Sequence, residues 1–234
     1  MKNWPEVQFI KRKRQKYIRI RVRPEKIIVS APKRCSKREM SSFLQDKTEW
    51  VNATLFKMKK QVAELEKRKA DNEGKILLRG EWKPLMKVRI NNSGDRWDFF
   101  ERDNRLLYAP PAGVSDYPPE KVLLSFYHYC AKREIPERFY NYSENLPFEF
   151  NKVYIRSQKT KWGTCSSKKN ISFNWRLVKC PYWIWEYLFI HELCHTVHMN
   201  HSKEYWALVN RYYPAYKKAR KWIKENGMLI FDTP

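Results

Sequence analysis

The chain has 234 residues and a mass of 28.6 kDa, which is enough for one large domain or two small ones with a buried core. Hydrophobic residues make up 42% of the chain and aromatic residues 15%, and this composition excludes a wholly disordered protein. The formal net charge of +23, from 48 Lys and Arg against 25 Asp and Glu, favours polyanionic partners such as nucleic acid.

The sequence has no feature typical of an exported protein or a membrane protein. The N-terminal segment is basic but contains no apolar core, so we expect no secretory signal. The densest apolar run, residues 180–190, carries Glu186 and is too short to span a bilayer. The five cysteines are scattered and form no CxxC pair, which is typical of free thiols in a reducing compartment. We therefore expect a cytoplasmic protein that does not enter a membrane.

The first predicted element is a strand over residues 17–23, where apolar and basic residues alternate strictly. Its apolar side chains share one face, and the opposite face carries three arginines: Arg19, Arg21 and Arg23. Pro24 and Glu25 indicate a turn, after which residues 27–29 predict a returning strand.

A long helical region follows. Ser36 and Glu39 have the spacing of a capping box, which predicts the start of a helix that extends, with a break allowed, to about Ala70. Residues 75–110 alternate short apolar runs with turn signals at 91–95 and 103–104, a pattern typical of a β meander.

The rest of the chain adds one strand pair to several helices. Residues 148–175 predict a strand, a turn at 166–170 and a second strand. The helices are expected at 118–140, 181–198, 202–213 and 214–226, the last of them ending at Gly227. The predicted class is α+β, with antiparallel strands and long helices in an N-terminal part, 1–142, and a second part at 143–234.

Four of the five histidines lie within eleven residues, at positions 191, 195, 198 and 201. The pattern is HExxH, in which His191 and His195 lie one turn apart on the same face of a helix and can bind one metal ion. Glu192 lies one step round the helix, where it can reach a water on the metal. Three protein ligands and one open position are typical of catalytic zinc, whereas structural zinc sites are closed by four ligands.

The third ligand is predicted to be His201, provided that the chain bends after the helix. Asn200 tolerates a left-handed conformation and could make that bend. His198 is the rival ligand, although three histidines on one helical face give poor tetrahedral angles. Two other interpretations stay open: an ordinary amphipathic core helix, and a structural zinc site that adds Cys194 to the three histidines.

Zinc polarises a carbonyl and lowers the pKa of its water towards about 7. Glu192 would then accept the proton of the water and pass it to the leaving amine. The oxyanion needs a further donor, for which Lys159, Lys161 and Tyr205 are candidates. Tyr205 also belongs to an apolar helical stripe, so packing is an alternative role for it.

The segment before the zinc motif pairs Trp162 with Gly163, which predicts that some group approaches the backbone closely there, and an extended peptide substrate that adds to a strand edge could do so. A tight hairpin with Trp162 and Trp175 in the core is the alternative. Cys165 could bind the zinc in a resting form or be a buried thiol.

Together these motifs resemble the YgjP-like metallopeptidase family, which is related to the SprT-like and WLM zinc proteases. The resemblance is carried by Lys159-Thr-Lys-Trp-Gly-Thr-Cys165, by Asn170–Val178, by His191-Glu-Leu-Cys-His195, by Met199–Ser202 and by Tyr205-Trp206. It covers about residues 150–210 closely and implies a zincin-like core, metal ligation by His191, His195 and His201, and Glu192 as the general base. The +6 spacing also matches the metzincins, but their glycine is replaced here by His198, which argues against that group.

Basic residues concentrate in the N-terminal third, including residues 11–14, and again at residues 217–221. A face with several cations would bind nucleic acid without sequence preference, although charge runs are often only solvated. SprT-like and WLM proteins act on proteins attached to DNA, which favours this partner by analogy. The sequence thus predicts a zinc metallopeptidase with one zinc ion and a polypeptide substrate. The alternatives are a nucleic-acid-binding module with structural zinc and a hydrolase of non-peptide amides.

Overall fold

The computed structural model describes residues 4–88, 97–114 and 119–232. The chain divides into two compact units, residues 1–71 and 72–234. The predicted α+β class is confirmed, because the described residues form six α-helices and three small sheets that mix parallel and antiparallel pairs. None of the described helices is long and apolar enough to cross a membrane.

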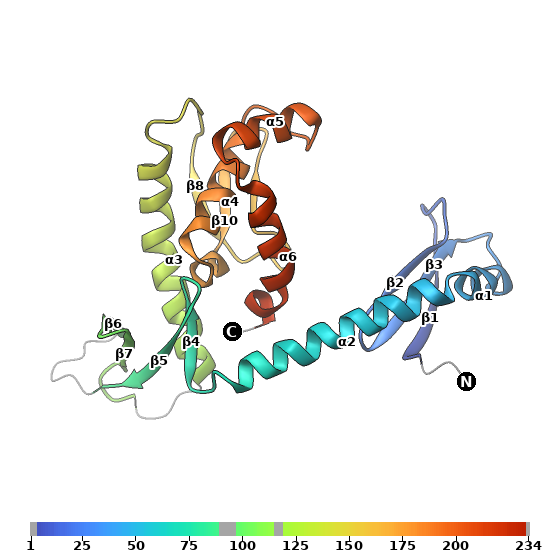
Figure 1. The fold of residues 1–234 in the computed structure, drawn as a ribbon, viewed down its shortest axis with the longest axis horizontal. Coiled ribbons are helices and arrows are strands. Elements are labelled where there is room, and N and C mark those ends of the chain that lie inside the picture. Colours follow the sequence, from blue (N-terminus) through green and yellow to red (C-terminus); the bar gives the residue numbers. More distant parts are fainter. Residues whose placement is uncertain (1–3, 89–96, 115–118, 233–234) are drawn as a thin grey trace. The chain divides into compact units, whose positions relative to one another are not determined.

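The first unit is a three-stranded sheet with two helices (Figure 1). The strand order is β1-β3-β2, with β1 parallel and β2 antiparallel to the central strand. The sequence did not predict β1, and its parallel pairing makes this sheet mixed rather than purely antiparallel. The elements are β1 (Glu6–Arg12), β2 (Arg19–Val22), β3 (Lys26–Pro32), α1 (Lys37–Asp46) and α2 (Thr48–Ala70).

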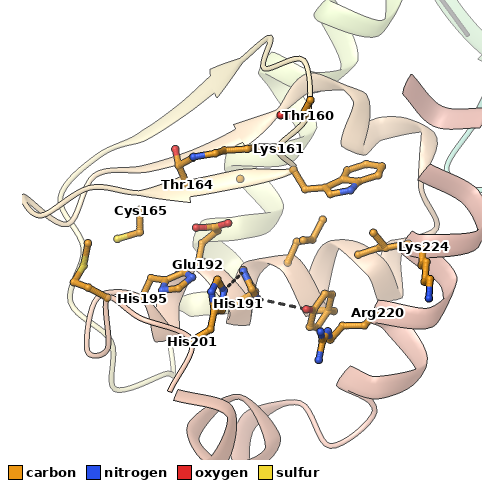
Figure 2. Close-up of a pocket in the computed structure, with 16 residues that line it drawn as sticks. Thr160, Lys161, Thr164, Cys165, His191, Glu192, His195, His201, Arg220 and Lys224 are labelled. Carbon is orange, nitrogen blue, oxygen red and sulfur yellow. Dashed lines mark hydrogen bonds between the residues drawn. The ribbon is translucent and has the colours of Figure 1, made fainter. Parts of the chain in front are cut away.

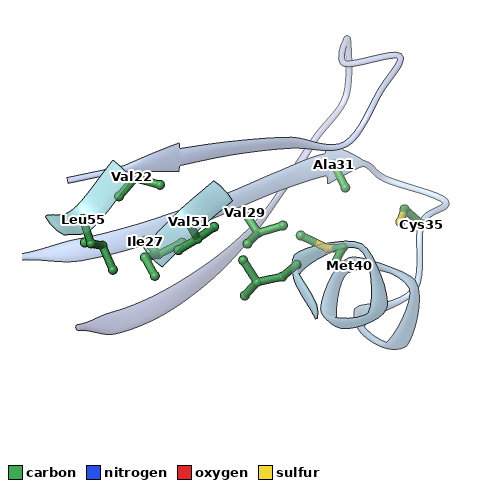
Figure 3. Packing of buried hydrophobic residues seen from close by; sticks show 9 residues of the cluster. Val22, Ile27, Val29, Ala31, Cys35, Met40, Val51 and Leu55 are labelled. Atoms are coloured by element: carbon green, nitrogen blue, oxygen red, sulfur yellow. The ribbon is translucent and has the colours of Figure 1, made fainter. Parts of the chain in front are cut away.

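The core of the first unit lies between the sheet and its helices. Figure 3 shows Val22 and Ile27 of the sheet beside Val51 and Leu55 of α2, with Met40 of α1 packed further along. All five side chains are buried. The alternation in β2 is confirmed, since Ile20 packs against this cluster while the neighbouring arginines are exposed.

The helical region begins with the predicted capping box. The Ser36 side chain accepts a hydrogen bond from the Glu39 backbone N–H at 3.1 Å, and the Glu39 carboxylate accepts one from the Ser36 N–H at 2.6 Å. The predicted break falls at Lys47, the residue between α1 and α2, whose φ of −103° and ψ of 17° depart from helical values.

The second unit opens with a four-stranded sheet in the order β4-β5-β7-β6. The meander predicted for residues 75–110 is wrong in one respect, because β5 and β7 pair in parallel. The predicted turn at Asp103 and Asn104 is present, with φ of 49° and 58°, values that suit a tight hairpin; the turn predicted at 91–95 lies outside the described residues. The strands are β4 (Lys75–Leu78), β5 (Glu81–Lys87), β6 (Asp98–Arg102) and β7 (Arg105–Ala109).

The helix α3 (Pro119–Ser143) joins this sheet to the C-terminal part of the chain. It packs along the short 3-10 helix η1 (Trp175–Lys179), to which the β4–β5 turn is also bonded through the N–H groups of Arg79 and Gly80. The Arg79 guanidinium also bonds Glu134 of α3 at 2.8 and 3.0 Å. The boundary predicted near residue 142 lies within the second compact unit, and the first unit ends at Asp71.

A second three-stranded sheet precedes the histidine helix. Its order is β8-β10-β9, so within the described residues β9 is an edge strand that pairs with β10 alone. The predicted turn at 166–170 connects these two antiparallel strands, and Lys169 within it has a φ of 54°. The strands are β8 (Val153–Arg156), β9 (Gly163–Cys165) and β10 (Ile171–Asn174).

Three helices complete the second unit (Figure 1). They are α4 (Tyr182–Cys194), α5 (Lys203–Tyr212) and α6 (Tyr216–Asp232). The predicted stop at Gly227 is wrong, because α6 continues to Asp232. Leu229 and Ile230 are buried in that extension and Phe231 packs against Trp162, and this burial outweighs the roughly 1 kcal/mol by which glycine disfavours a helix.

Candidate metal centre

The buried helix α4 carries the first two histidines of the cluster at its C-terminal end. His191 lies in its last turn, and His195 is the residue that caps the helix. The ring nitrogens of His191, His195 and His201 that face one another lie within 4.8 Å. The Nε2 atoms of His191 and His201 are 3.4 Å apart (Figure 2). The structure therefore brings together the three histidines that the sequence singled out as ligands.

The chain reaches His201 by leaving the helix earlier than predicted. α4 ends at Cys194 rather than near His198, and residues 195–197 form turns. Asn200 does not have a positive φ, so the expected left-handed bend at this position is wrong. The Ser202 side chain then accepts a hydrogen bond from the Tyr205 N–H and begins α5, which fixes His201 just before that helix.

Hydrogen bonds on the outer side of the rings favour the tautomers that a metal requires. The Nδ1–H of His195 donates to the backbone carbonyl of His198 at 3.0 Å, because a carbonyl can only accept. The Tyr205 hydroxyl donates to the His191 carbonyl at 3.0 Å and can accept from the His191 Nδ1–H at 2.7 Å. Both Nε2 atoms are then left with a free lone pair towards the cluster, as in known metal-binding histidines.

The three rings also hold little positive charge. Burial lowers the pKa of His191 to about 3, and the neighbouring His195, His201 and Arg220 contribute to the same shift. Burial is also the main cause that lowers the pKa of His195 and of His201. Neutral imidazoles are the form that binds a metal ion, so the donor set fits a divalent cation.

Other donors that the sequence raised do not join the cluster. Cys194 is fully buried and Cys165 half-buried, and neither belongs to the group of facing ligand atoms. His198 is also outside that group and offers its backbone carbonyl to His195 instead. Within the described part of the chain, three histidines without a fourth protein ligand match catalytic rather than closed structural zinc sites.

Glu192 lies beside the cluster and is almost completely buried, with 3% of its surface exposed. Burial raises the pKa of its carboxyl to about 8, whereas Lys161 lowers it. Its Oε2 atom has no hydrogen-bond partner within the described part of the chain, an unusual state for a buried carboxylate oxygen. A buried acceptor that faces a group of neutral histidines is consistent with a site for a cation and a water.

The carboxylate of Glu192 is held against the backbone of β9 at Gly163. A Cβ atom on residue 163 would lie 2.8 Å from Cδ and 2.9 Å from Cγ of Glu192, closer than real Cβ contacts. Only glycine leaves the carboxylate its present place, so the close approach predicted at Gly163 is with Glu192 of the same chain.

Comparison with known proteins shows the family of the chain. Residues 16–226 match the YgjP-like metallopeptidase domain. The chain belongs to the YgjP-like metallopeptidase family.

No curated protein matches this YgjP-like chain. One solved structure, that of the metallopeptidase zymogen of Pyrococcus abyssi abylysin, is 22% identical to it and covers 38% of this chain and 93% of its own. The TM-score of 0.34 is too low for the two folds to be equated.

The histidines of this YgjP-like protein open into a pocket of about 560 Å³. Figure 2 shows the cluster and Glu192 on its floor, the strand segment with Lys161 and Thr164 above them, and α6 with Arg220 on another side. Trp162 and Gly163, which the sequence named as a substrate-binding segment, also line it.

Not every predicted site residue reaches the pocket. Tyr205 is fully buried, lies outside the pocket lining and holds His191, so its placement does not support contact with a substrate oxyanion. Lys159 also lies outside the lining. Trp175 is buried in the core as the hairpin alternative required, whereas Trp162 is only partly buried and contacts Phe231.

The three arginines proposed for nucleic acid lie in the first unit. Arg19 and Arg21 are on the exposed face of β2, and Arg23 lies beyond its end with Glu25 at 4.0 Å. Two pocket cations on α6, Arg220 and Lys224, were not predicted from the sequence. Their spacing of four residues within a basic helix is a signal that they share a face, but the run 217–221 by itself indicates only a basic surface.

Proposed function

We propose that this YgjP-like metallopeptidase is a zinc enzyme that cleaves peptide bonds, with His191, His195 and His201 as zinc ligands and Glu192 as the general base. The observation that carries this proposal is the convergence of three neutral imidazoles beside a buried carboxylate in one pocket. Imidazole ligands suit several transition metals, and zinc is the one that three histidines and an open position most often hold.

Zinc in such a site polarises a carbonyl oxygen and makes a water nucleophilic at neutral pH. Glu192 contributes the proton transfer: its unpartnered Oε2 accepts the proton of the attacking water and returns it to the leaving amine. Gly163 keeps the carboxylate close to the cluster. Lys161, whose charge acts on Glu192 across the pocket, provides a positive charge for the developing oxyanion.

The edge strand β9 supports a polypeptide substrate. One of its edges pairs with β10, and its residues line the pocket. An extended peptide can add to a free strand edge through main-chain hydrogen bonds, which would place it next to Trp162 and Gly163. All five cysteines are free, and we keep a cytoplasmic location as part of this proposal.

The test is Glu192→Gln in protein purified without added metal. We expect zinc near one equivalent in both proteins, and a kcat at least about 10²-fold lower in the variant on a casein or peptide-library digest. His201→Ala serves as the matched control and should lose metal as well as activity. Full activity of Glu192→Gln would exclude this base. Unfolding on chelation, with no hydrolysis by the wild type, would favour a structural zinc site.

A second proposal concerns the first unit, which we infer contacts nucleic acid. Residues 1–71 hold 21 of the basic residues against 8 acidic ones. Beside the exposed arginines of β2, a hollow of about 400 Å³ is lined by cations and by Tyr17, which is 71% exposed. An exposed aromatic ring among cations suits an unpaired base and its phosphates.

Salt titration of binding to a fluorescent single-stranded oligonucleotide tests this second proposal. Arg19→Gln, Arg21→Gln and Arg23→Gln together should lower the slope of log K against log salt by about 2 to 3, since each phosphate contact contributes roughly 0.7 to 0.9. A control removes three exposed charges from the second unit, at Lys168, Lys203 and Lys217. If the slope of log K against log salt were the same for both triple variants, the arginines of the β2 face would have no specific role in binding nucleic acid.

A further inference from the structure

The pocket of the candidate metal centre is strongly cationic. Lys161 lies on the side of the β9 segment, and Arg220 and Lys224 lie on α6 (Figure 2). Among the described residues that line the pocket, Glu192 is the only acidic one, and it is buried at the floor. Three cations therefore share this pocket with the histidines.

These cations have no acidic partners in the parts of the chain that the structure describes. No Asp or Glu of these parts forms an ion pair with Arg220, Lys224 or Lys161. Arg220 and Lys224 are also one helical turn apart, an arrangement of like charges that slightly destabilises a helix. Two uncompensated cations on the same side of a pocket are a stability cost that an anionic ligand would remove.

Arg220 is held in a fixed place by aromatic contacts. Its guanidinium lies 4.4 Å from the centre of the Trp206 ring. Trp206 in turn stacks on His201, with ring centres 5.5 Å apart and planes at 20°, and on Tyr216 at 5.4 Å and 21°. The stack couples the position of Arg220 to that of a proposed metal ligand, while the arginine itself stays exposed.

Arg220 is close enough to the cluster to act on whatever is bound there. It lines the same pocket as the three histidines, and its guanidinium packs on the Trp206 ring that also stacks on His201. A planar guanidinium can bind both oxygens of a carboxylate in parallel, whereas a lysine adds a flexible point charge. The pair on α6 thus has the chemistry of a carboxylate-recognition site next to the scissile bond.

We propose that Arg220, assisted by Lys224, binds a carboxylate of the substrate, so that the enzyme prefers peptides with an acidic group close to the bond that is cut. This inference rests on the proposed peptidase function and names its substrate class. The carboxylate can be an Asp or Glu side chain or the C-terminus of the peptide, and both sources offer the same planar anion.

The experiment compares zinc-loaded wild type on a family of fluorogenic peptides. Each carries Glu, Gln or Lys at one of the two positions on either side of the scissile bond, and each is made with a free and with an amidated C-terminus. We expect kcat/KM to be about 10- to 100-fold higher for the preferred acid than for its amide, the usual range for one charge-assisted hydrogen-bond pair. The comparison of Glu with Gln peptides tests for a side-chain carboxylate, and the comparison of free with amidated peptides tests for the C-terminal carboxylate.

Variants assign the preference to α6. Arg220→Gln with Lys224→Gln should remove most of the preference, so that the ratio of kcat/KM between the Glu and Gln peptides falls towards one, mainly through KM. Arg220→Lys should keep only part of the preference for an acidic group, because lysine lacks the planar guanidinium that binds both carboxylate oxygens. Lys217→Gln with Lys221→Gln is the matched control: it removes two exposed charges of the same helix that do not line the pocket, and the preference should persist.

Binding provides a readout that does not depend on turnover. Zinc-loaded Glu192→Gln should bind the acidic peptide about 10- to 100-fold more tightly than the amide in fluorescence polarisation, and the α6 double variant should bind both alike. Cleavage or binding without preference for acid would overturn the inference and leave the peptidase proposal standing. Preferential binding without any cleavage by the wild type would support a carboxylate-binding site at Arg220 and Lys224 but would overturn the peptidase proposal and, with it, the inferred cleavage preference.

Discussion

Single residues fix the geometry of the proposed metal site. Some do so by leaving space for a neighbouring side chain, and others by restricting a histidine to one tautomer. Gly163 is the clearest case, since any side chain there would displace the Glu192 carboxylate. Tyr205 is another, because its hydroxyl leaves His191 one tautomer in which Nε2 is free for a metal. Both contact the proposed catalytic groups directly and would act on a substrate only through them.

Gly163→Ala should lower kcat by about 10²-fold, because a displacement of the base by about 1 Å has an effect of this size. Zinc content should stay at the wild-type value, since no ligand is moved. The matched control is Gly227→Ala, whose added Cβ would meet only the Trp162 ring at 3.9 Å. That variant should keep its activity and gain some helix stability. Wild-type kcat in a folded Gly163→Ala protein would contradict the positioning role.

At the scale of elements, local sequence patterns predicted helix starts and turns correctly, whereas the pairing of strands could not be predicted from them. The capping box at Ser36, the break after it and the Asp103 turn can all be predicted, because each depends on neighbouring residues. Strand β1 was not predicted, since its polar and apolar residues alternate only from Glu6 to Phe9 and its partner β3 is distant in sequence. The parallel pairing of β5 with β7 likewise depends on contacts distant in sequence.

In the metal centre, too, some features can be predicted from the sequence and others cannot. HExxH indicates the helix and its two histidines, because helical periodicity fixes their shared face. The predicted end of α4 is several residues too late, since the His195 ring bonds the His198 carbonyl across the turns of residues 195–197, a local contact that helical periodicity does not indicate. The pocket cations of α6 cannot be singled out from the sequence, because the packing of α6 decides which of its basic residues face inwards.

At the scale of the whole molecule, the two compact units differ in what stabilises them. The first has a core of aliphatic side chains around β3. The second contains a buried lysine, Lys179, with no exposed surface, whose amine lies 4.5 Å from the Tyr127 ring and 3.4 Å from the carbonyl oxygen of Ile230 in α6. This amine therefore ties the last turn of α6 to η1 and α3.

The stability of the second unit should depend on pH through Lys179. Burial, with a smaller contribution from the charge of Arg176, lowers the pKa of its amine from 10.5 to about 7, and Cys180 opposes the shift. Between about pH 7 and 10.5 the unfolded chain carries a proton that the folded chain lacks, so the free energy of unfolding rises with pH through this window. Below about pH 7 both states are protonated and this dependence ends.

Lys179→Met should remove that dependence. Relative to the wild type, the variant should be more stable at about pH 7 than at about pH 10, because only the wild type gains stability between these values. Urea titration at both pH values measures the free energies of unfolding. Exposed Lys168→Met is the control and should follow the wild type at both pH values. A constant difference for Lys179→Met would show that the amine stays charged in the fold.

The stacking of Trp206 on His201 has a practical consequence. One of the ten indoles of the protein lies face to face with a proposed ligand, and indole emission is sensitive to charge placed beside the ring. The chain thereby contains its own optical reporter: occupation of the histidine cluster can be followed by intrinsic fluorescence, without a label and without a substrate.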